Sequence, residues 1–424
     1  MNPLSQSELI QLQNDLGARL KRAKDSGYQL NISRGNPSPE QLDLATPMLS
    51  LPGPSDYISK DNIDCRSYGI VDGLPEMKQL FAGILECPME NIIIGGNSSL
   101  TMMHDALFRA YQWGSGATTI PWRKQGTIRF LCPSPGYDRH FSITELFGFE
   151  MLPVEMTAEG PNMDQVEALC SDSSVKGIWC VPRYSNPTGI TYDDKVINRL
   201  AGMETAPDFR IFWDNAYAEH HLTLEPNPLK NILDACIETG NDDRVLMFAS
   251  TSKISLAGAG VAAIGASLAN IQDARTKIRI QTIGSDKINQ LRHMLFFKDL
   301  EGLRKHMRKH ASILRPKFEL VEEILQRELG EKNIATWSKP NGGYFISLDV
   351  PSGCARRVIA MTEDAGVTLT PAGASFPHGL DPNDCNIRIA PTYPSIEDLG
   401  RAIELLAICI QLVAIDDHLE KISV

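Results

Sequence analysis

Four short apolar runs mark the middle of the chain. They span residues 127–133, 176–182, 209–215 and 244–250, and each ends in turn-forming or polar residues. Helical or irregular segments separate them. Near-continuous apolar strands that alternate with helices are typical of a mainly parallel sheet covered on both faces. In such sheets, ligands bind beyond the carboxyl ends of the strands, so the residues that follow each run are the candidates for function.

The N-terminal third predicts helices and one long connector. Residues 5–25 carry apolar side chains at helical spacing after a serine, and residues 75–85 begin with a proline that suits a first helical turn. Residues 91–111 predict a strand, a turn and a helix. The segments 35–47 and 51–56 are rich in proline and turn residues, so we expect an extended connector there.

The pattern changes after about residue 300. A long amphipathic helix is predicted over 308–330 and another helix over 396–416, with short, antiparallel-looking strands between them. We therefore predict an α/β fold in two parts. The large domain spans residues 46–299, and the segments 1–45 and 300–424 form a smaller α+β domain.

Composition and charge argue against several classes of protein. The 424 residues carry a formal net charge of −11, which disfavours binding to nucleic acid or to an anionic membrane surface. The N-terminus lacks the pattern of a signal peptide, and the apolar stretch 402–415 is too short to span a bilayer. The nine cysteines lack metal-binding spacing. We expect a cytoplasmic protein with reduced thiols and no metal.

One lysine stands in an unusual place. Lys253 lies in the segment FASTSKISLAGAG, among small residues and just beyond the apolar run 244–250. A lysine shielded from water has a lowered pKa, and its neutral amine can react with an aldehyde. Small neighbours leave room for a flat cofactor. A lone lysine at this place is also compatible with an ordinary surface position.

Other strand ends carry residues that suit the same chemistry. Asp214 and Tyr217 follow one run, and Asn186 follows another, in SNPTG. A carboxylate can keep a pyridine nitrogen protonated, and a phenol or an amide can bind its ring oxygen. Arg388, in the strand-like segment NIRIA, can grip a carboxylate. Taken singly, these residues also fit turns or a structural ion pair.

A helix start supplies a candidate anion site. The segment GGNSSL, residues 95–100, opens the helix predicted within 91–111 with small residues. Free N–H groups and the helix dipole at such a start suit a phosphate. An ordinary N-cap explains the same residues.

Together these motifs resemble the class I/II aminotransferases of fold type I, which depend on pyridoxal phosphate. SNPTG, DNAY, STSK, PAGASF and NIRIA occur in the order of that family, and the resemblance covers nearly the whole chain. It implies that Lys253 bonds to the cofactor aldehyde and later moves the substrate α-proton. Asp214 would hold the pyridine nitrogen, Tyr217 and Asn186 the ring oxygen, and Arg388 the substrate α-carboxylate. Ser250 would bind the phosphate.

Two further segments extend the resemblance. In PSPGYDRH, Tyr137 matches the ring that stacks on the cofactor, and His140 matches a histidine that supports the aspartate. In YGIVDGLPE, Tyr68 matches a tyrosine that reaches the phosphate in the partner subunit's site. The resemblance therefore implies a homodimer with shared active sites. Tyr68 is also compatible with a simple packing role.

The chain departs from the family at one position. Many members carry an arginine eight residues after the lysine, whereas this chain has Val261. The phosphate must then be held by other groups, and the candidates are Asn97, Ser98, Ser99, Ser250, Ser252 and Ser255. The small-residue segment around Val261 resembles the type Ic aspartate aminotransferases, which are related to the MocR regulators.

That lineage implies aspartate and glutamate as amino acids, with 2-oxoglutarate and oxaloacetate as oxo acids. The segments NISRGNPSPEQL and SDKINQLRH also resemble it. They make Gly35, Arg34 and Lys287 candidate substrate-binding residues, with Arg292 as a further cation. Whether Lys287 and Arg292 act in their own subunit's site or in the partner's stays open. Spacing does not choose among the cations. Another amino-acid preference, a lyase or racemase on the same cofactor, and a regulator without catalysis stay open as alternatives.

Overall fold

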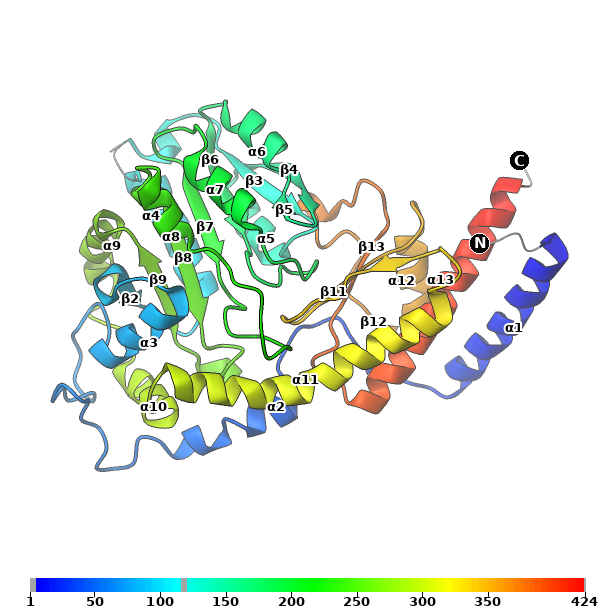
Figure 1. Ribbon diagram of the computed structural model, residues 1–424, viewed down its shortest axis with the longest axis horizontal. Coiled ribbons are helices and arrows are strands. Elements are labelled where there is room, and N and C mark those ends of the chain that lie inside the picture. Colours follow the sequence, from blue (N-terminus) through cyan, green and yellow to red (C-terminus); the bar gives the residue numbers. More distant parts are fainter. Residues whose placement is uncertain (1–4, 116–119, 423–424) are drawn as a thin grey trace.

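The computed structural model describes residues 5–115 and 120–422. An eight-stranded sheet with strand order β2-β9-β8-β7-β6-β3-β4-β5 lies at its centre (Figure 1). Its strands are β2 (Ile92–Ile94), β3 (Arg129–Ser134), β4 (Glu150–Thr157), β5 (Gly160–Pro161), β6 (Val175–Cys180), β7 (Arg210–Asp214), β8 (Val245–Ser250) and β9 (Ala262–Ala266). The five strands from β8 to β4 run parallel, while β9 and β5 pair antiparallel. The predicted α/β fold with a mainly parallel sheet is confirmed.

The strands of the sheet other than β5 face two separate apolar cores, because side chains alternate along a strand. On β7, Ile211 and Trp213 belong to one apolar cluster, whereas Phe212 belongs to the other. On β8, Met247 and Phe248 divide in the same way. The helices that supply these clusters and the layers around them are α3 (Pro75–Leu85), α4 (Ser99–Trp113), α5 (Asp138–Leu146), α6 (Met163–Cys170), α7 (Asp194–Gly202), α8 (Ile232–Glu238), α9 (Leu268–Gln281) and α10 (Lys287–Phe297).

A third apolar cluster draws on both ends of the chain. It contains residues of α1 (Gln6–Asp25), α11 (Leu300–Leu329), α12 (Ala355–Asp364) and α13 (Ile396–Ile422). α1 packs against α13, and α11 runs from α10 to α13 (Figure 1). Since Leu303 packs in a sheet core and Leu314 in the third cluster, α11 belongs to both parts. The division at residues 45 and 300 stays a prediction.

The smaller part holds two further sheets. β10 (Thr336–Trp337), β11 (Ile346–Asp349) and β13 (Asn386–Ile389) form an antiparallel sheet. In contrast, β12 (Val367–Thr368) pairs parallel with β1 (Leu30–Asn31), so the antiparallel expectation was wrong for that strand. The pairing joins the N-terminal segment to the C-terminal part of the chain.

The predicted extended connector contains helical turns. α2 spans Pro39–Asp43, and a 3-10 helix spans Thr46–Ser50. A capping box explains α2, because the Ser38 hydroxyl accepts from the Gln41 backbone while the Gln41 side chain accepts from the Ser38 N–H. Pro39 at the first helical position suits the same start. None of the described helices is long and apolar enough to cross a membrane.

Candidate active site

The carboxyl ends of three neighbouring strands open into one cavity. It has a volume of about 110 Å³, and it also receives the start of α4 and the segment that follows β3. The residues that line it are Ser98, Ser99, Leu100, Tyr137, Val181, Asn186, Asp214, Ala216, Tyr217, Ser250, Ser252 and Lys253. The structure thus brings together most of the predicted cofactor-binding residues, although they are far apart in the sequence.

Lys253 is the one cation among the residues that line this cavity. β8 ends at Ser250, and the chain then turns, with the N–H groups of Ile254 and Ser255 donating to the Thr251 carbonyl. The Lys253 ammonium lies 5.1 Å from the centroid of the Tyr217 ring. Burial lowers the pKa of Lys253, and the negative charge of Asp214 offsets part of that effect. A larger fraction of the Lys253 amine is therefore neutral and nucleophilic at this site than it would be in water.

Asp214 presents one free carboxylate oxygen. The side chain is 3% exposed, and its Oδ2 lies 3.0 Å from Nε2 of His140. Its Oδ1 is buried and has no hydrogen-bond partner among the described residues. A buried acceptor without a donor costs about 1–3 kcal/mol. The site is therefore suited to a ligand that brings its own N–H, such as a protonated pyridine nitrogen.

His140 is held in place by its neighbours. Its ring stacks on Trp179 with centroids 4.4 Å apart and an angle of 8° between the planes. The Trp179 indole N–H donates to the hydroxyl of Thr144 over 2.8 Å, and that hydroxyl donates to the His140 carbonyl, also over 2.8 Å. The stacked indole holds the imidazole against Asp214, and the bonds through Thr144 tie Trp179 to the His140 backbone. The supporting role of His140 toward a cofactor stays a prediction.

Two tyrosines form walls of the cavity. Tyr137 precedes α5 and meets the His140 ring edge to face, with centroids 5.0 Å apart. Burial, and secondly the charge of Asp214, raises the pKa of Tyr137. Burial also raises the pKa of Tyr217 well above its ordinary value. Both phenols therefore stay protonated and can donate hydrogen bonds to a ring oxygen.

Hydroxyl groups and a helix start form the other end of the cavity. Ser98 is the N-cap of α4, and its side chain makes no capping bond, so the first N–H groups of the helix are free for a ligand. Ser99, Ser250 and Ser252 also line this region. The Ser252 hydroxyl donates to the carbonyl of Asn97 over 2.9 Å. This arrangement suits a phosphate.

Val261 leaves no cation at this end. It is buried, and its N–H donates to the hydroxyl of Thr251. Gly260 before it packs so closely that an added Cβ would lie 2.8 Å from the Ser252 hydroxyl. Ser255 is turned away, with its hydroxyl 2.8 Å from Nε2 of His293, so the suggestion that it binds phosphate was wrong.

Arg388 lies beside Asn186 and forms an ion pair with a carboxylate of its own chain. Its Nη1 donates to Asp138 Oδ1 over 2.9 Å and to Asn186 Oδ1 over 3.4 Å, and its side chain is 9% exposed. Its Nε donates to the Thr370 hydroxyl over 3.3 Å. Asp138 was not among the predicted site residues. An acid in the first turn of α5 is explained by the helix dipole alone, so nothing marked it as a site residue.

Gly35 and Arg388 both contact the ring of Phe345. An added Cβ at Gly35 would come within 2.3 Å of Phe345, and the Arg388 guanidinium lies 5.0 Å from the centroid of the same ring. The next residue back, Arg34, is exposed and forms no ion pair with a described residue. The segment SRGNP therefore passes close to Arg388, and its Arg34 is a cation without an ion-pair partner among the described residues.

Three predicted residues lie away from the cavity of their own chain. Lys287 is 5% exposed, and its Nζ donates to the Gly69 carbonyl over 3.0 Å. Arg292 donates to the carbonyl of Leu51 over 2.8 Å. Both cations are bound to backbone oxygens of their own chain, so neither reaches the cavity of that chain, and their contact with substrate stays a prediction. Tyr68 is 83% exposed, next to the loop that Lys287 holds.

Comparisons with known proteins bear on this site. The family model described as aspartate amino-transferase matches residues 4–421. The chain is 51% identical to a relative from Mycolicibacterium smegmatis over 390 residues, which cover 91% of each protein. It is 46% identical to the aspartate aminotransferase of Corynebacterium glutamicum over 405 residues, 95% of this chain and 94% of the relative.

Solved structures agree with the family match. The crystal structure of an aspartate transaminase from Corynebacterium glutamicum is similar with a TM-score of 0.95 and 44% identity over 98% of both chains. That of an alpha-aminoadipate aminotransferase from Thermus thermophilus has a TM-score of 0.74 at 18% identity, over 94% of this chain and 95% of the other. The second likeness shows the shared fold.

Proposed function

The chain belongs to the aspartate amino-transferase family, and from that premise we propose that it is a pyridoxal-phosphate-dependent aspartate transaminase. It would move an amino group between aspartate or glutamate and the oxo acids 2-oxoglutarate and oxaloacetate. The observation that carries the proposal is one cavity that holds both a lysine amine of lowered pKa and the unpartnered Oδ1 of Asp214.

The residues of the cavity fit the cofactor. Asp214 Oδ1 would accept from the pyridine N–H, and Tyr217 and Asn186 would bind the ring oxygen. The phosphate would lie at the start of α4, on Ser98, Ser99, Ser250 and Ser252. When bound, pyridoxal phosphate supplies an aldehyde that condenses with amino groups and a ring that takes up the electron pair of a broken Cα–H bond.

Lys253 would carry the proton in the reaction. Its neutral Nζ can take the proton from the substrate Cα as a base and give it back at another carbon as an acid. The lowered pKa of Lys253 raises the fraction of neutral amine at a given pH. Tyr217, 5.1 Å away at its ring centroid, would keep water from the amine and limit its movement.

Substrate recognition would divide between two arginines. Arg388 would bind the α-carboxylate through two guanidinium N–H groups. Asn186, which accepts from Arg388, would fix the orientation of the guanidinium. The exposed Arg34 would meet the side-chain carboxylate of aspartate, because the segment that carries it passes Phe345 and Arg388. A charge-assisted contact of about 1.5–3 kcal/mol corresponds to roughly one to two decades in kcat/KM.

We further propose that the enzyme is a homodimer with shared active sites. An aromatic side chain that is 83% exposed, as Tyr68 is, suits burial against a second subunit. The Lys287 ammonium and the Gln290 side chain both bind the segment 69–74, so the loop after Tyr68 is held firmly in its own subunit. A firmly held loop can present Tyr68 to the phosphate end of the partner's cavity.

A half-reaction screen tests the proposed activity. The cofactor-loaded protein is mixed with aspartate, alanine, phenylalanine or kynurenine, and the loss of its cofactor absorbance is followed. We expect aspartate to react with the highest kcat/KM and Arg34→Ala to narrow its lead over alanine. Arg22→Ala, which removes an exposed arginine on α1, is the control. If aspartate is not preferred by the wild type, the proposed substrate is wrong.

A further inference from the structure

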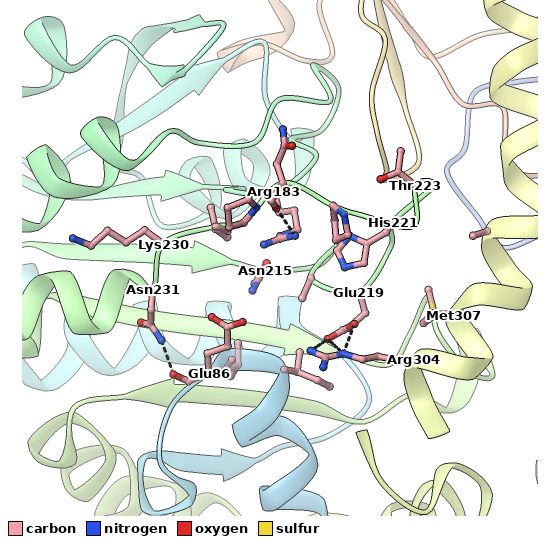
Figure 2. Close-up of a pocket in the computed structure, with 18 of the residues that line it drawn as sticks. Glu86, Arg183, Asn215, Glu219, His221, Thr223, Lys230, Asn231, Arg304 and Met307 are labelled. Carbon is pink, nitrogen blue, oxygen red and sulfur yellow. Dashed lines mark hydrogen bonds and ion pairs between the residues drawn. The ribbon is translucent and has the colours of Figure 1, made fainter. Parts of the chain in front are cut away.

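A second, larger cavity lies on the other face of β7. Its volume is about 470 Å³, and it is bounded by the end of α3, the loop 218–231 and α11 (Figure 2). Asp214 lines the first cavity, whereas its neighbours Trp213 and Asn215 line the second. This follows from the alternation of side chains along an extended segment. The two cavities are therefore separated by the thickness of one strand.

The floor of this second cavity is apolar. It is formed by buried side chains from three elements, Trp213 on β7, Met247 on β8 and Met307 on α11. Ligand sites in proteins are commonly concave and mostly apolar, with a few polar groups that fix orientation, and they occupy about 300–1,000 Å³. At about 470 Å³, the second cavity falls within that range of volumes.

The rim of the second cavity carries an excess of positive charge. Five basic and two acidic residues line it, in a chain whose net charge is −11. One of the acids, Glu219, is taken up by Arg304, which donates to both its carboxylate oxygens over 3.0–3.2 Å. Lys230 and Arg308 form ion pairs with Glu238 and Glu301, which lie outside the cavity lining. Two of the five cations are therefore left without a carboxylate partner among the described residues.

Within the described part of the chain, Arg183 and Arg315 are the cations of the rim that lack an ion pair. Arg183 donates through Nη1 to the carbonyl of Asn227 over 3.2 Å, and Arg315 through Nε to the carbonyl of Leu222 over 2.7 Å. Neither forms an ion pair with a described residue. A guanidinium has five N–H donors, so each keeps donors for a ligand. Figure 2 shows Arg183 above Asn215, near the middle of the cavity.

Two further polar side chains, His221 and Asn215, line this cavity. The pKa of His221 is lowered to about 4, firstly by burial and then by the charges of Arg183 and Arg304. His221 therefore stays neutral and adds no positive charge to the rim. The Oδ1 atom of Asn215 is buried without a hydrogen-bond partner among the described residues. This acceptor is suited to an N–H or O–H group on the uncharged part of a ligand.

We propose that this second cavity binds a small organic anion, with a carboxylate or phosphate group on Arg183 and an apolar body over Trp213, Met247 and Met307. This inference goes beyond the transaminase proposal and does not depend on it. The site is close to the first cavity in the chain, since Arg183 precedes Asn186 by three residues and Asn215 follows Asp214 directly.

Calorimetric titration of the cofactor-loaded protein tests the proposal. The probes are phenyl phosphate and phenylacetate, with phenylacetamide as the neutral analogue. We expect one or both anions to bind and the neutral analogue to bind at least tenfold more weakly, because a charge-assisted contact is lost. The comparison of the two anions identifies whether phosphate or carboxylate is the preferred group.

Variants locate the binding. Arg183→Gln should weaken the binding of the better probe about tenfold or more, whereas Arg388→Gln, beside the first cavity, should not change it. Ser312→Glu adds a carboxylate at an exposed position of the rim and should weaken binding as well, which keeps the test valid if Arg183→Gln does not fold. Unchanged affinity in the folded rim variants, loss of affinity in Arg388→Gln, or no binding of either anion at millimolar concentration would overturn the proposal.

Discussion

Asp138 and Arg388 form an ion pair of 2.9 Å between the first turn of α5 and strand β13. The arginine proposed to bind the substrate α-carboxylate thus already holds a carboxylate of its own chain. Asp138 is 34% exposed, so solvent screens the pair and its contribution is small, about 1 kcal/mol or less. The substrate must share Arg388 with Asp138 or displace it.

Removal of this internal carboxylate should favour the substrate. In Asp138→Asn, the guanidinium is no longer shared, and we expect the KM for aspartate to fall by up to about fivefold. Asp138→Glu keeps the charge and is the matched control. Steady-state kinetics check the prediction, and a KM that rises in Asp138→Asn would mean that Asp138 holds Arg388 in its binding position.

The contact between His140 and Asp214 should matter for both cofactor and turnover. His140→Leu leaves the buried carboxylate without its histidine donor, which costs about 1–3 kcal/mol. We expect weaker retention of pyridoxal phosphate on dialysis and a fall in kcat of at least tenfold. His140→Gln can still donate to Asp214 and should keep most of both. Equal losses in the two variants would point to ring stacking on Trp179 as the main role of His140.

Buried histidines should make the fold sensitive to acid. Burial lowers the pKa of His293 to about 4 in the folded chain, against an ordinary value near 6.5. Between these values the unfolded chain binds more protons, so stability rises with pH and is lost as pH falls from 6.5 to 4. The contribution of His293 is at most about 3 kcal/mol.

His293→Gln tests that assignment. Glutamine does not titrate, and it can still meet the hydroxyls of Thr251 and Ser255, which lie 3.0 and 2.8 Å from the histidine Nε2. Urea unfolding at pH 6.5 and at pH 4.5 should therefore show a smaller loss of stability in the variant than in the wild type. An identical loss would assign the acid sensitivity to other groups, such as His310.

Shared active sites predict complementation in mixed dimers. A Lys253→Ala chain lacks the lysine but supplies Tyr68 to its partner, and a Tyr68→Phe chain does the reverse. One of the two sites in the mixed dimer is then intact, and the other carries both changes. We expect activity well above that of either parent dimer. If the mixed dimers are no more active than the average of the parents, Tyr68 does not act across subunits.

The sequence predicted the site where local patterns mark it. Asp214 ends the buried strand β7, and Lys253 follows the largely buried strand β8, so the end of an apolar run located each of them. The capping box at Ser38 was visible in the sequence too, but proline and glycine around it favoured an extended connector. In that segment the local bonds of Ser38 and Gln41 outweigh the composition.

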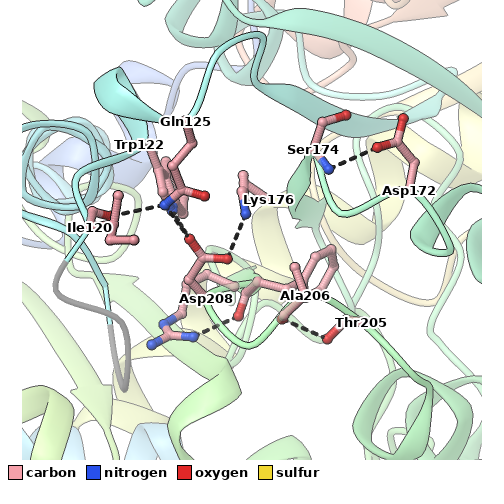
Figure 3. A network of polar contacts seen from close by, with 11 residues as sticks. Ile120, Trp122, Gln125, Asp172, Ser174, Lys176, Thr205, Ala206 and Asp208 are labelled. Atoms are coloured by element: carbon pink, nitrogen blue, oxygen red, sulfur yellow. Dashed lines mark hydrogen bonds and ion pairs between the residues drawn. The ribbon is translucent and has the colours of Figure 1, made fainter.

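Contacts between distant residues had no such signal. Lys287 is a cation in a segment that resembles a substrate-binding loop, yet its role depends on the Gly69 carbonyl, 218 residues away. Similarly, Lys176 starts an apolar strand, and the structure buries its ammonium 2.7 Å from Asp208, which also accepts from Trp122 (Figure 3). Only the folded chain shows that each of these ammonium groups binds an oxygen atom of a residue distant in the sequence.

The most direct test of the account concerns Lys253. Borohydride reduction of the cofactor-loaded protein fixes the cofactor to the amine that carries it, and peptide mapping then locates the pyridoxyl group. We predict a single label on Lys253, its absence in Lys253→Ala, and a loss of several orders of magnitude in the turnover of that variant. A label on another lysine, or full activity in Lys253→Ala, would contradict the proposed mechanism.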